Sequence, residues 1–263
     1  MSDKKNGKEK KDEKLAEGTL ISHLLELRDR LLKAVLGVVV VFVPAAFFRN
    51  EIFELIARPM LEQLGAGNSL IATGVMSPFL TPFKVAFFFA LFLAMPWVLY
   101  QVWAFVAPGL YRKEKSFAVP LLVSSIGLFY FGIFFAYRFV LPMAFKVTAH
   151  SAPEGVQTLP DINVYIDFVL RIFLAFGVAF EVPVAVVLLV ATGLVPVEKF
   201  SGARGYVVIG IFVAAAVLTP PDPISQLLMA IPMWLLYEAG VIMARIMVRK
   251  RTGNADEKEK PAS

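Results

Sequence analysis

The chain contains no cysteine, and only His23 and His150 among its 263 residues are histidines. The absence of cysteine excludes disulfides, thiolate nucleophiles, iron–sulfur clusters and cysteine-ligated zinc. The two histidines lie far apart in the sequence, so they cannot form an HExxH site, and a Ser-His-Asp triad would have to use one isolated ring. The sequence also carries no phosphate loop, Rossmann turn or nucleic-acid module. We therefore expect no cofactor, no metal, no nucleic-acid partner and no enzymatic chemistry.

Charged residues are scarce too, at 18% of the chain, whereas hydrophobic residues make up 58% and Phe alone contributes 24 residues. A soluble globular chain is roughly 45 to 50% apolar even when glycine is counted. The mean hydropathy of +0.69 points the same way. This composition, with its long apolar runs, predicts an all-α polytopic integral membrane protein.

Four apolar segments are long enough to cross a hydrocarbon core of roughly 30 Å as helices, and two shorter ones flank a proline-rich turn at 219–223. The short pair can span only as a hairpin whose ends snorkel or whose bilayer thins locally. Pro96 and Pro183 lie inside two of the longer segments and predict kinks. The six predicted transmembrane helices are about 31–48, 82–105, 117–140, 164–194, 205–218 and 224–245.

The predicted transmembrane domain covers residues 19–247, between a charged N-terminal tail at 1–18 and a C-terminal tail at 248–263. The N-terminal tail has too few apolar residues to offset the entropy of ordering, so we expect it to be disordered. The first span should be retained, because acids precede it and no small-residue cleavage site follows it. Of the 26 Lys and Arg residues, 20 fall on the side of the N-terminus, which predicts that both termini are cytoplasmic.

Two carboxylates on the predicted cytoplasmic side are candidate binding groups. Glu26 lies in an amphipathic segment before the first span, and Glu114 is the only acid in a basic loop that follows several aromatic residues. Carboxylates beside aromatic rings suit the capture of guanidinium groups, since arginine pairs bidentately with carboxylate and stacks on rings. The alternative is structural: i,i+4 pairs of Glu26 with Arg30 and of Asp29 with Lys33 would form a salt-bridged collar, and Glu114 would balance charge.

Three ionisable residues share one face of the fourth predicted span. Asp167, Arg171 and Glu181 fall within an 80° stripe at about 100° per residue. Asp167 and Arg171 are spaced to neutralise each other as an i,i+4 pair. Glu181 lies about 21 Å of helix rise further along, where an acid is costly unless it is protonated, paired or hydrated. It is therefore predicted to be functional or to join helices through a polar contact.

Four motifs carry a resemblance to a known family. They are SHLLELR at 22–28, YQVWAFVAPGLY at 100–111, FEVPV at 180–184 and LTPPD at 218–222. In this order they resemble the TatC family, the polytopic core subunits of the twin-arginine protein translocase, over residues 19 to 247. The resemblance implies six helices in a cupped, glove-like wall with short fifth and sixth spans, in a bacterial inner membrane.

The resemblance also implies roles for individual residues. Glu26 and Glu114 would receive the two arginines of a signal peptide on folded cargo, with Phe105 and Arg28 shaping that cytoplasmic patch. Glu181 would be the membrane-embedded polar residue against which TatA-like and TatB-like single-span partners and the inserted signal peptide pack. Gln226 is expected as a membrane-embedded polar or partner contact at the outer hairpin tip, and Pro59 and Asp222 match outer-loop positions, although turn and cap chemistry also explains Asp222 and Gln226. The implied assembly contains several copies and uses the proton-motive force.

Other functions remain compatible with the residues alone. A proton-coupled secondary transporter would use Glu181 as its titrating carboxylate and Asp222 as an outer gate, although six unequal spans without obvious repeats disfavour it. An intramembrane enzyme would need paired aspartates, an HExxH helix or a Ser/His dyad, none of which is evident. A purely structural scaffold would tolerate replacement of Glu181 without loss of export.

Overall fold

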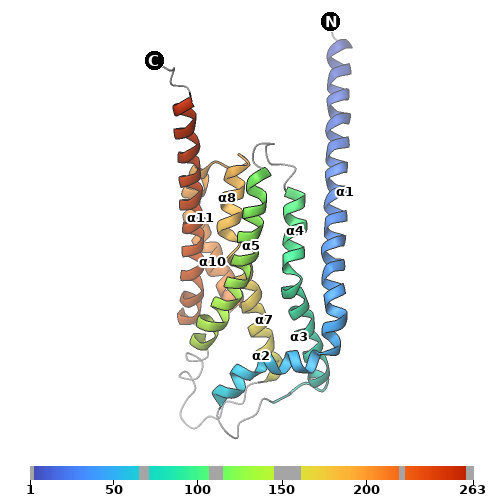
Figure 1. The fold of residues 1–263 in the computed structure, drawn as a ribbon, viewed down its shortest axis with the longest axis vertical. Helices are drawn as coiled ribbons and strands as arrows, with labels where there is room; N and C mark the ends of the chain where they lie inside the picture. The colour runs from blue at the N-terminus through green and yellow to red at the C-terminus, as the bar shows by residue number, and fades with distance from the viewer. Residues whose placement is uncertain (1–2, 65–70, 107–114, 145–160, 219–222, 259–263) are drawn as a thin grey trace.

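The structure, a computed structural model, describes residues 3–64, 71–106, 115–144, 161–218 and 223–258. At 3–20, 59–64, 115–118, 225 and 251–258 it describes the backbone alone. The described part is helical, which confirms the all-α prediction (Figure 1). Its elements are α1 (Asp3–Phe47), α2 (Arg49–Leu64), α3 (Ser77–Leu93), α4 (Met95–Val106), α5 (Lys115–Phe135), the π-helix η2 (Ala136–Val140), α7 (Ile162–Ala179), α8 (Val182–Ala191), α9 (Val197–Gly202), α10 (Arg204–Leu218) and α11 (Pro223–Lys258).

The long helices account for the predicted membrane spans. Four apolar helical stretches are long enough to cross a bilayer, and the bent pair α3 and α4 forms a fifth. The four are Ile21–Phe47, Val119–Ala144, Ile162–Ala191 and Gln226–Lys250. With the shorter apolar helix α10, six helical segments correspond to the six predicted spans, and the molecule is a multi-pass membrane protein.

The two ends of the molecule differ in what they carry. The start of α1 and the end of α11 lie at the same end, which we call the terminal end, as an even number of spans requires (Figure 1). The helix α2 lies across the opposite end, which we call the far end. At the far end, a parallel β-bridge joins Ile71 to Asp161 and ties the two connections that precede α3 and α7.

The first helix is longer than expected. It begins at Asp3, so the backbone of residues 3–18 is helical, although we expected the tail to be disordered. Lysine and glutamate have high helix propensity, and the amphipathic helix that follows provides a nucleus onto which they can add. The tail boundaries themselves stay a prediction.

Both predicted kinks coincide with helix breaks. The axes of α3 and α4 differ by 50°, and Pro96 is the second residue of α4. Because Pro96 has no N–H, the Phe92 carbonyl loses its usual i+4 donor. It accepts a hydrogen bond from the Tyr130 hydroxyl at 3.0 Å, together with a backbone N–H at the helix cap. The break between α7 and α8 falls at Phe180 and Glu181, just before Pro183.

The C-terminal hairpin departs from the prediction in one helix. The helix α10 has 15 residues and is short as expected, but α11 contains a 25-residue stretch, Gln226–Lys250, that is apolar enough to cross a bilayer, so the short sixth span that the resemblance implies is wrong. Glu238 lies inside this stretch. In the structure Arg204 Nε donates a hydrogen bond to Glu238 Oε2 at 3.0 Å, so the carboxylate is paired between α10 and α11 and the helix continues past it.

Close approach between helices fixes the core. A Cβ added to Gly132 on α5 would lie 2.6 Å from the carbonyl oxygen of Phe176 on α7, and one added to Gly240 on α11 would lie 2.8 Å from Cα of Pro183 on α8. Only glycine permits backbones this close. The α5–α7 contact surrounds the fully buried Phe129 and Phe176, and the α8–α11 contact holds the second half of the fourth span against the last helix.

Candidate functional site

The helices α1 and α4 form an antiparallel seam at the terminal end. Helical spacing places His23, Glu26, Arg30 and Lys33 on one face of α1, and Trp97, Gln101 and Phe105 on one face of α4. We call these seven residues the α1–α4 seam. Three contacts close it. The His23 and Phe105 rings stack with centroids 4.5 Å apart, Arg30 donates to Gln101 Oε1 at 3.4 Å, and Trp97 Nε1 donates to the Lys33 carbonyl at 2.9 Å.

Glu26 lies in the middle of this seam. Its carboxylate is 3.6 Å from the Arg30 guanidinium, which confirms the predicted i,i+4 pair, and its side chain is 36% exposed. At 3.6 Å the contact is a loose ion pair and is longer than a good hydrogen bond. The carboxylate therefore keeps the capacity to accept hydrogen bonds from a second cation.

Three further residues, Arg28, Phe105 and Glu114, are predicted to lie with Glu26, and the structure brings only Phe105 close to it. Phe105 stacks on His23, one helical turn from Glu26, as the prediction requires. Arg28 is exposed, and its position two residues from Glu26 places it on nearly the opposite side of α1. It does not share the face that meets α4. Glu114 lies outside the described residues.

Glu181 occupies the break between α7 and α8. The Ser125 hydroxyl on α5 donates to Glu181 Oε2. The second carboxylate oxygen, Oε1, is buried and has no hydrogen-bond partner within the described part of the chain. A buried oxygen without a partner is costly in apolar surroundings. The geometry thus leaves one atom of an embedded carboxyl group able to bind a donor or an acceptor from a neighbouring helix.

Gln226 lies at the outer hairpin, where the sequence places it, and far from Glu181. It is half-buried in the first turn of α11, at the far end. The point where α11 meets the start of α8 is Gly240, about 21 Å of helix rise away from Gln226. Of the predicted outer-loop residues, Pro59 lies on α2, where its side chain is outside the described residues, and Asp222 is also outside them.

A polar network that the sequence reading missed joins α3 to α7 at the far end. The Asp161 carboxylate caps α7 by accepting hydrogen bonds from the N–H groups of Asn163 and Val164 at 2.8 and 3.1 Å. Its other oxygen accepts from the Thr73 amide at 2.9 Å and the Thr73 hydroxyl at 2.5 Å. These four donors, with Thr73 contributing most, lower the pKa of Asp161 to about 2.

The same network continues along the two helices. Asn163 binds the buried Ser77 and Thr81 hydroxyls, and Lys84 Nζ donates to Asp167 Oδ1 at 2.6 Å. We call these contacts the α3–α7 seam. Its members are Thr73, Ser77, Thr81 and Lys84 on one side and Asp161, Asn163 and Asp167 on the other. The predicted pairing of Asp167 with Arg171 is therefore wrong, because Asp167 is directed at Lys84 on the neighbouring helix. The 4, 4, 3 spacing of polar residues from 73 to 84 was the available signal.

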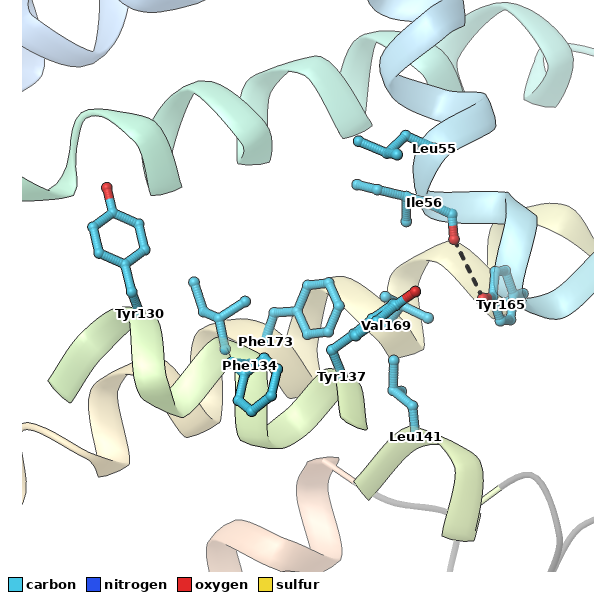
Figure 2. Close-up of a pocket in the computed structure, with 10 residues that line it drawn as sticks. Leu55, Ile56, Tyr130, Phe134, Tyr137, Leu141, Tyr165, Val169 and Phe173 are labelled. Atoms are coloured by element: carbon cyan, nitrogen blue, oxygen red, sulfur yellow. Dashed lines mark hydrogen bonds between the residues drawn. The ribbon is translucent and has the colours of Figure 1, made fainter. Parts of the chain in front are cut away.

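An apolar cavity of about 390 Å³ lies between α2, α5, η2 and α7 at the far end (Figure 2). Tyr165 closes one side, and its hydroxyl donates to the Ile56 carbonyl on α2 at 3.5 Å. The remaining lining is mostly aromatic and aliphatic. Within the described residues, no three His, Cys, Asp or Glu side chains are grouped so that they could hold a metal. The polar groups of the α1–α4 seam and Glu181 are therefore the candidate functional site.

Comparison with known proteins identifies relatives over most of the chain. The profile of the TatC family, described as Sec-independent protein translocase protein (TatC), matches residues 22–232. A protein of that name from Azotobacter chroococcum mcd 1 is 51% identical over 243 residues, which cover 92% of this chain and 95% of the relative. Its counterpart from Escherichia coli (strain K12) is 51% identical over 231 residues, covering 88% and 90% respectively.

A solved structure gives the same result at the level of the fold. The crystal structure of a Twin Arginine Translocase Receptor, TatC, superposes on this chain with a TM-score of 0.77 at 35% sequence identity. The superposition covers 85% of this chain and 98% of the crystallised one.

Proposed function

This chain belongs to the TatC family of Sec-independent protein translocases, and from that premise we propose that the α1–α4 seam is its receptor site for twin-arginine signal peptides. As a family member the chain is the receptor subunit of the twin-arginine translocation system and not an enzyme. It is a multi-pass membrane protein that works in a Tat complex with other subunits.

The observation that carries the site assignment is the environment of Glu26. The carboxylate is half-exposed, its only described ion pair is loose, and the stacked His23 and Phe105 rings lie one turn away. An incoming guanidinium would find a charged acceptor and an adjacent aromatic face, which together favour arginine over lysine. Glu114, as the resemblance implies, supplies the second carboxylate, so that each arginine of the pair meets one acid. Arg28 contributes on the outer side of α1, away from the seam.

Glu181 serves the step that follows binding. The apolar part of the signal peptide inserts into the membrane beside α7 and α8, and TatB-like and TatA-like single-span subunits pack at the same place. The free Oε1 of Glu181 supports this assignment, because a polar group on a partner helix would satisfy it. Gln226, Pro59 and Asp222 contribute partner contacts at the far end. Several copies of the chain assemble in the complex, and the surrounding lipid bilayer is the solvent of all these contacts.

The proposed orientation of the protein in the membrane follows the distribution of its Lys and Arg residues. The terminal end, with most of the lysines and arginines, faces the cytoplasm, and the membrane is the bacterial inner membrane. The proton-motive force then supplies free energy of about 2.3 kcal/mol per charge moved through 100 mV.

Binding of a labelled signal peptide to the membrane-reconstituted protein tests the receptor site. We expect an Arg-Arg peptide to bind more tightly than its Lys-Lys variant, and Glu26→Gln and Glu114→Ala each to remove most of that preference. Asp29→Asn is the matched control, because Asp29 is an exposed acid on the same stretch of α1. Equal weakening of both peptides by Glu26→Gln would contradict specific recognition at the seam.

Export of a folded reporter tests the role of Glu181. Glu181→Ala should abolish export while leaving signal-peptide binding intact, and Ser125→Ala, which removes the hydroxyl that holds Oε2, should reduce it. Full export by Glu181→Ala would show that the embedded carboxyl group is dispensable and that its burial is only structural.

A further inference from the structure

An arginine inside the fourth span has no partner among the residues that the structure describes. Arg171 is exposed on α7, nine residues after Ile162, which corresponds to about 14 Å of helix rise. Val164 and Val178, one heptad to either side, are 70% and 54% exposed, so the three side chains form one outward stripe. Across the described residues, no hydrogen bond, ion pair or ring contact engages the Arg171 guanidinium. An ionisable group in such a position is a functional site by default.

The charges around Arg171 do not balance. Lys84 and Asp167 neutralise each other across the α3–α7 seam at 2.6 Å, and Arg171 lies one turn below Asp167 on the same side of α7. Two cations and one anion leave one positive charge at the edge of an apolar span. Asp167 is already directed at Lys84, and its second oxygen cannot serve as a full counter-ion for Arg171. Within the described residues no anion is left to balance the Arg171 guanidinium, so an external anion is its expected partner.

The depth of Arg171 in the membrane indicates which kind of anion it meets. The apolar stretch Ile162–Ala191 has 30 residues and rises about 45 Å, which exceeds a hydrocarbon core of roughly 30 Å. With the excess shared between both ends, Cα of Arg171 lies only about 6 Å inside the core on the far side. An extended arginine side chain snorkels across that depth and places its guanidinium at the headgroup level. Lys84, seven residues into α3, reaches the same level.

We propose that Arg171 binds the phosphate of an anionic phospholipid in the leaflet at the far end. The planar guanidinium holds two phosphate oxygens bidentately, and the exposed Val178, deeper in the membrane, provides apolar surface for the acyl chains. The net positive charge of the site favours a lipid with net negative charge over a zwitterionic one.

The test measures lipids retained by the purified full-length protein, by native mass spectrometry after reconstitution with phosphatidylglycerol or phosphatidylcholine. We expect the wild type to retain phosphatidylglycerol and Arg171→Gln to lose it at least tenfold. Arg138→Gln should behave as the wild type, since Arg138 lies at the same end of the molecule but is placed over the Phe139 ring at 5.8 Å. Retention that is equal in Arg171→Gln and Arg138→Gln would overturn the proposal.

Two further arms separate the possible sources of the anion. Inorganic phosphate added in detergent should compete only weakly, because it lacks acyl chains; full displacement at low concentration would overturn the lipid assignment. Asp167→Asn should increase phosphatidylglycerol retention, because it removes the local negative charge, and a gain of binding cannot result from misfolding. Loss of a co-purifying partner subunit from Arg171→Gln without loss of lipid would assign the arginine to a protein carboxylate instead and would also overturn it.

Discussion

The α3–α7 seam and the α1–α4 seam differ in how fully their polar groups are paired. This difference separates a structural contact between helices from a site that can bind a ligand. In the α3–α7 seam, Asp161 accepts four hydrogen bonds, Ser77 and Thr81 are buried, and the charged pair at Lys84 is short. In the α1–α4 seam, the ion pair of Glu26 is long and its carboxylate is half-exposed. Polar groups that are all hydrogen-bonded within the protein have no capacity left for a ligand, whereas a loosely paired carboxylate does. The α3–α7 seam therefore fixes the helices, and the α1–α4 seam keeps bonding capacity for a partner.

Breaking the charged pair of the α3–α7 seam should have the largest effect on stability. Lys84→Leu leaves Asp167 without its cation at the edge of the membrane, and because the pair is partly exposed we expect a loss of about 2 kcal/mol, below the cost for a fully buried pair. Thermal unfolding in detergent measures it. The double variant Lys84→Leu with Asp167→Leu should recover most of the loss; a double variant as unstable as the single one would show that packing, and not the unpaired charge, is responsible.

A matched pair of glycine substitutions tests how closely α1 and α4 approach. A Cβ on Gly37 would lie 2.2 Å from Cδ1 of Trp97, whereas one on Gly127 meets nothing within 4 Å. Gly37→Ala must displace the indole and its hydrogen bond to the Lys33 carbonyl, so we expect it to be about 1 to 2 kcal/mol less stable than Gly127→Ala. The measurement is again thermal unfolding. Equal stability of the two variants would mean that the indole relocates without cost.

Removing the stacked ring at the terminal end should affect binding more than folding. His23→Ala deletes the ring that stacks on Phe105, but His23 is exposed, so little buried contact is lost from the folded protein. We expect Arg-Arg peptide affinity to fall about threefold, with the unfolding free energy changed by less than about 0.5 kcal/mol. Titration of labelled peptide and thermal unfolding give the two numbers. A larger loss in stability than in affinity would assign the ring pair to the fold.

Acid should weaken the far end over a defined range. The pKa of Asp161 is lowered from its ordinary 3.8 to about 2, so its ionised form stabilises the folded state above pH 4. That contribution is lost as the pH falls from about 4 to about 2. Thermal unfolding between pH 5 and pH 2 should therefore show a decline that is smaller in Thr73→Val, which loses the hydroxyl donor. An identical decline in both proteins would assign the acid sensitivity to other carboxylates.

The sequence predicts the local features of this fold and misses contacts between distant segments. Hydropathy locates the spans, and Pro96 and Pro183 locate the breaks, because both depend on short stretches of chain. The partner of Asp167 is 83 residues away on another helix, and a local i,i+4 spacing suggested Arg171 instead. The pairing of Glu238 was missed for the same reason. Its partner, Arg204, lies 34 residues earlier and keeps α11 helical beyond the charge.

The candidate site was predictable to a similar extent. Glu26, Phe105 and Glu181 carry unusual residue types for their surroundings, so composition and resemblance single them out. The sequence does not indicate that Ser125 holds one oxygen of Glu181, or that Arg28 lies on the other side of α1 from the seam. Both facts depend on how two helices are rotated against each other, and rotation is set by packing.

The bend at Pro96 divides the second span into two helical segments, α3 and α4, that meet at a fixed point. The Tyr130 hydroxyl fastens the Phe92 carbonyl to α5 at the bend, so the segments on either side of it turn about an anchored point. The hydrogen-bond ladder is interrupted there, and tilting α4 strains no helical bond of α3. A bound ligand that displaces Phe105 and Gln101 can therefore shift α4 at the bend while the contact of Lys84 with Asp167 stays in place.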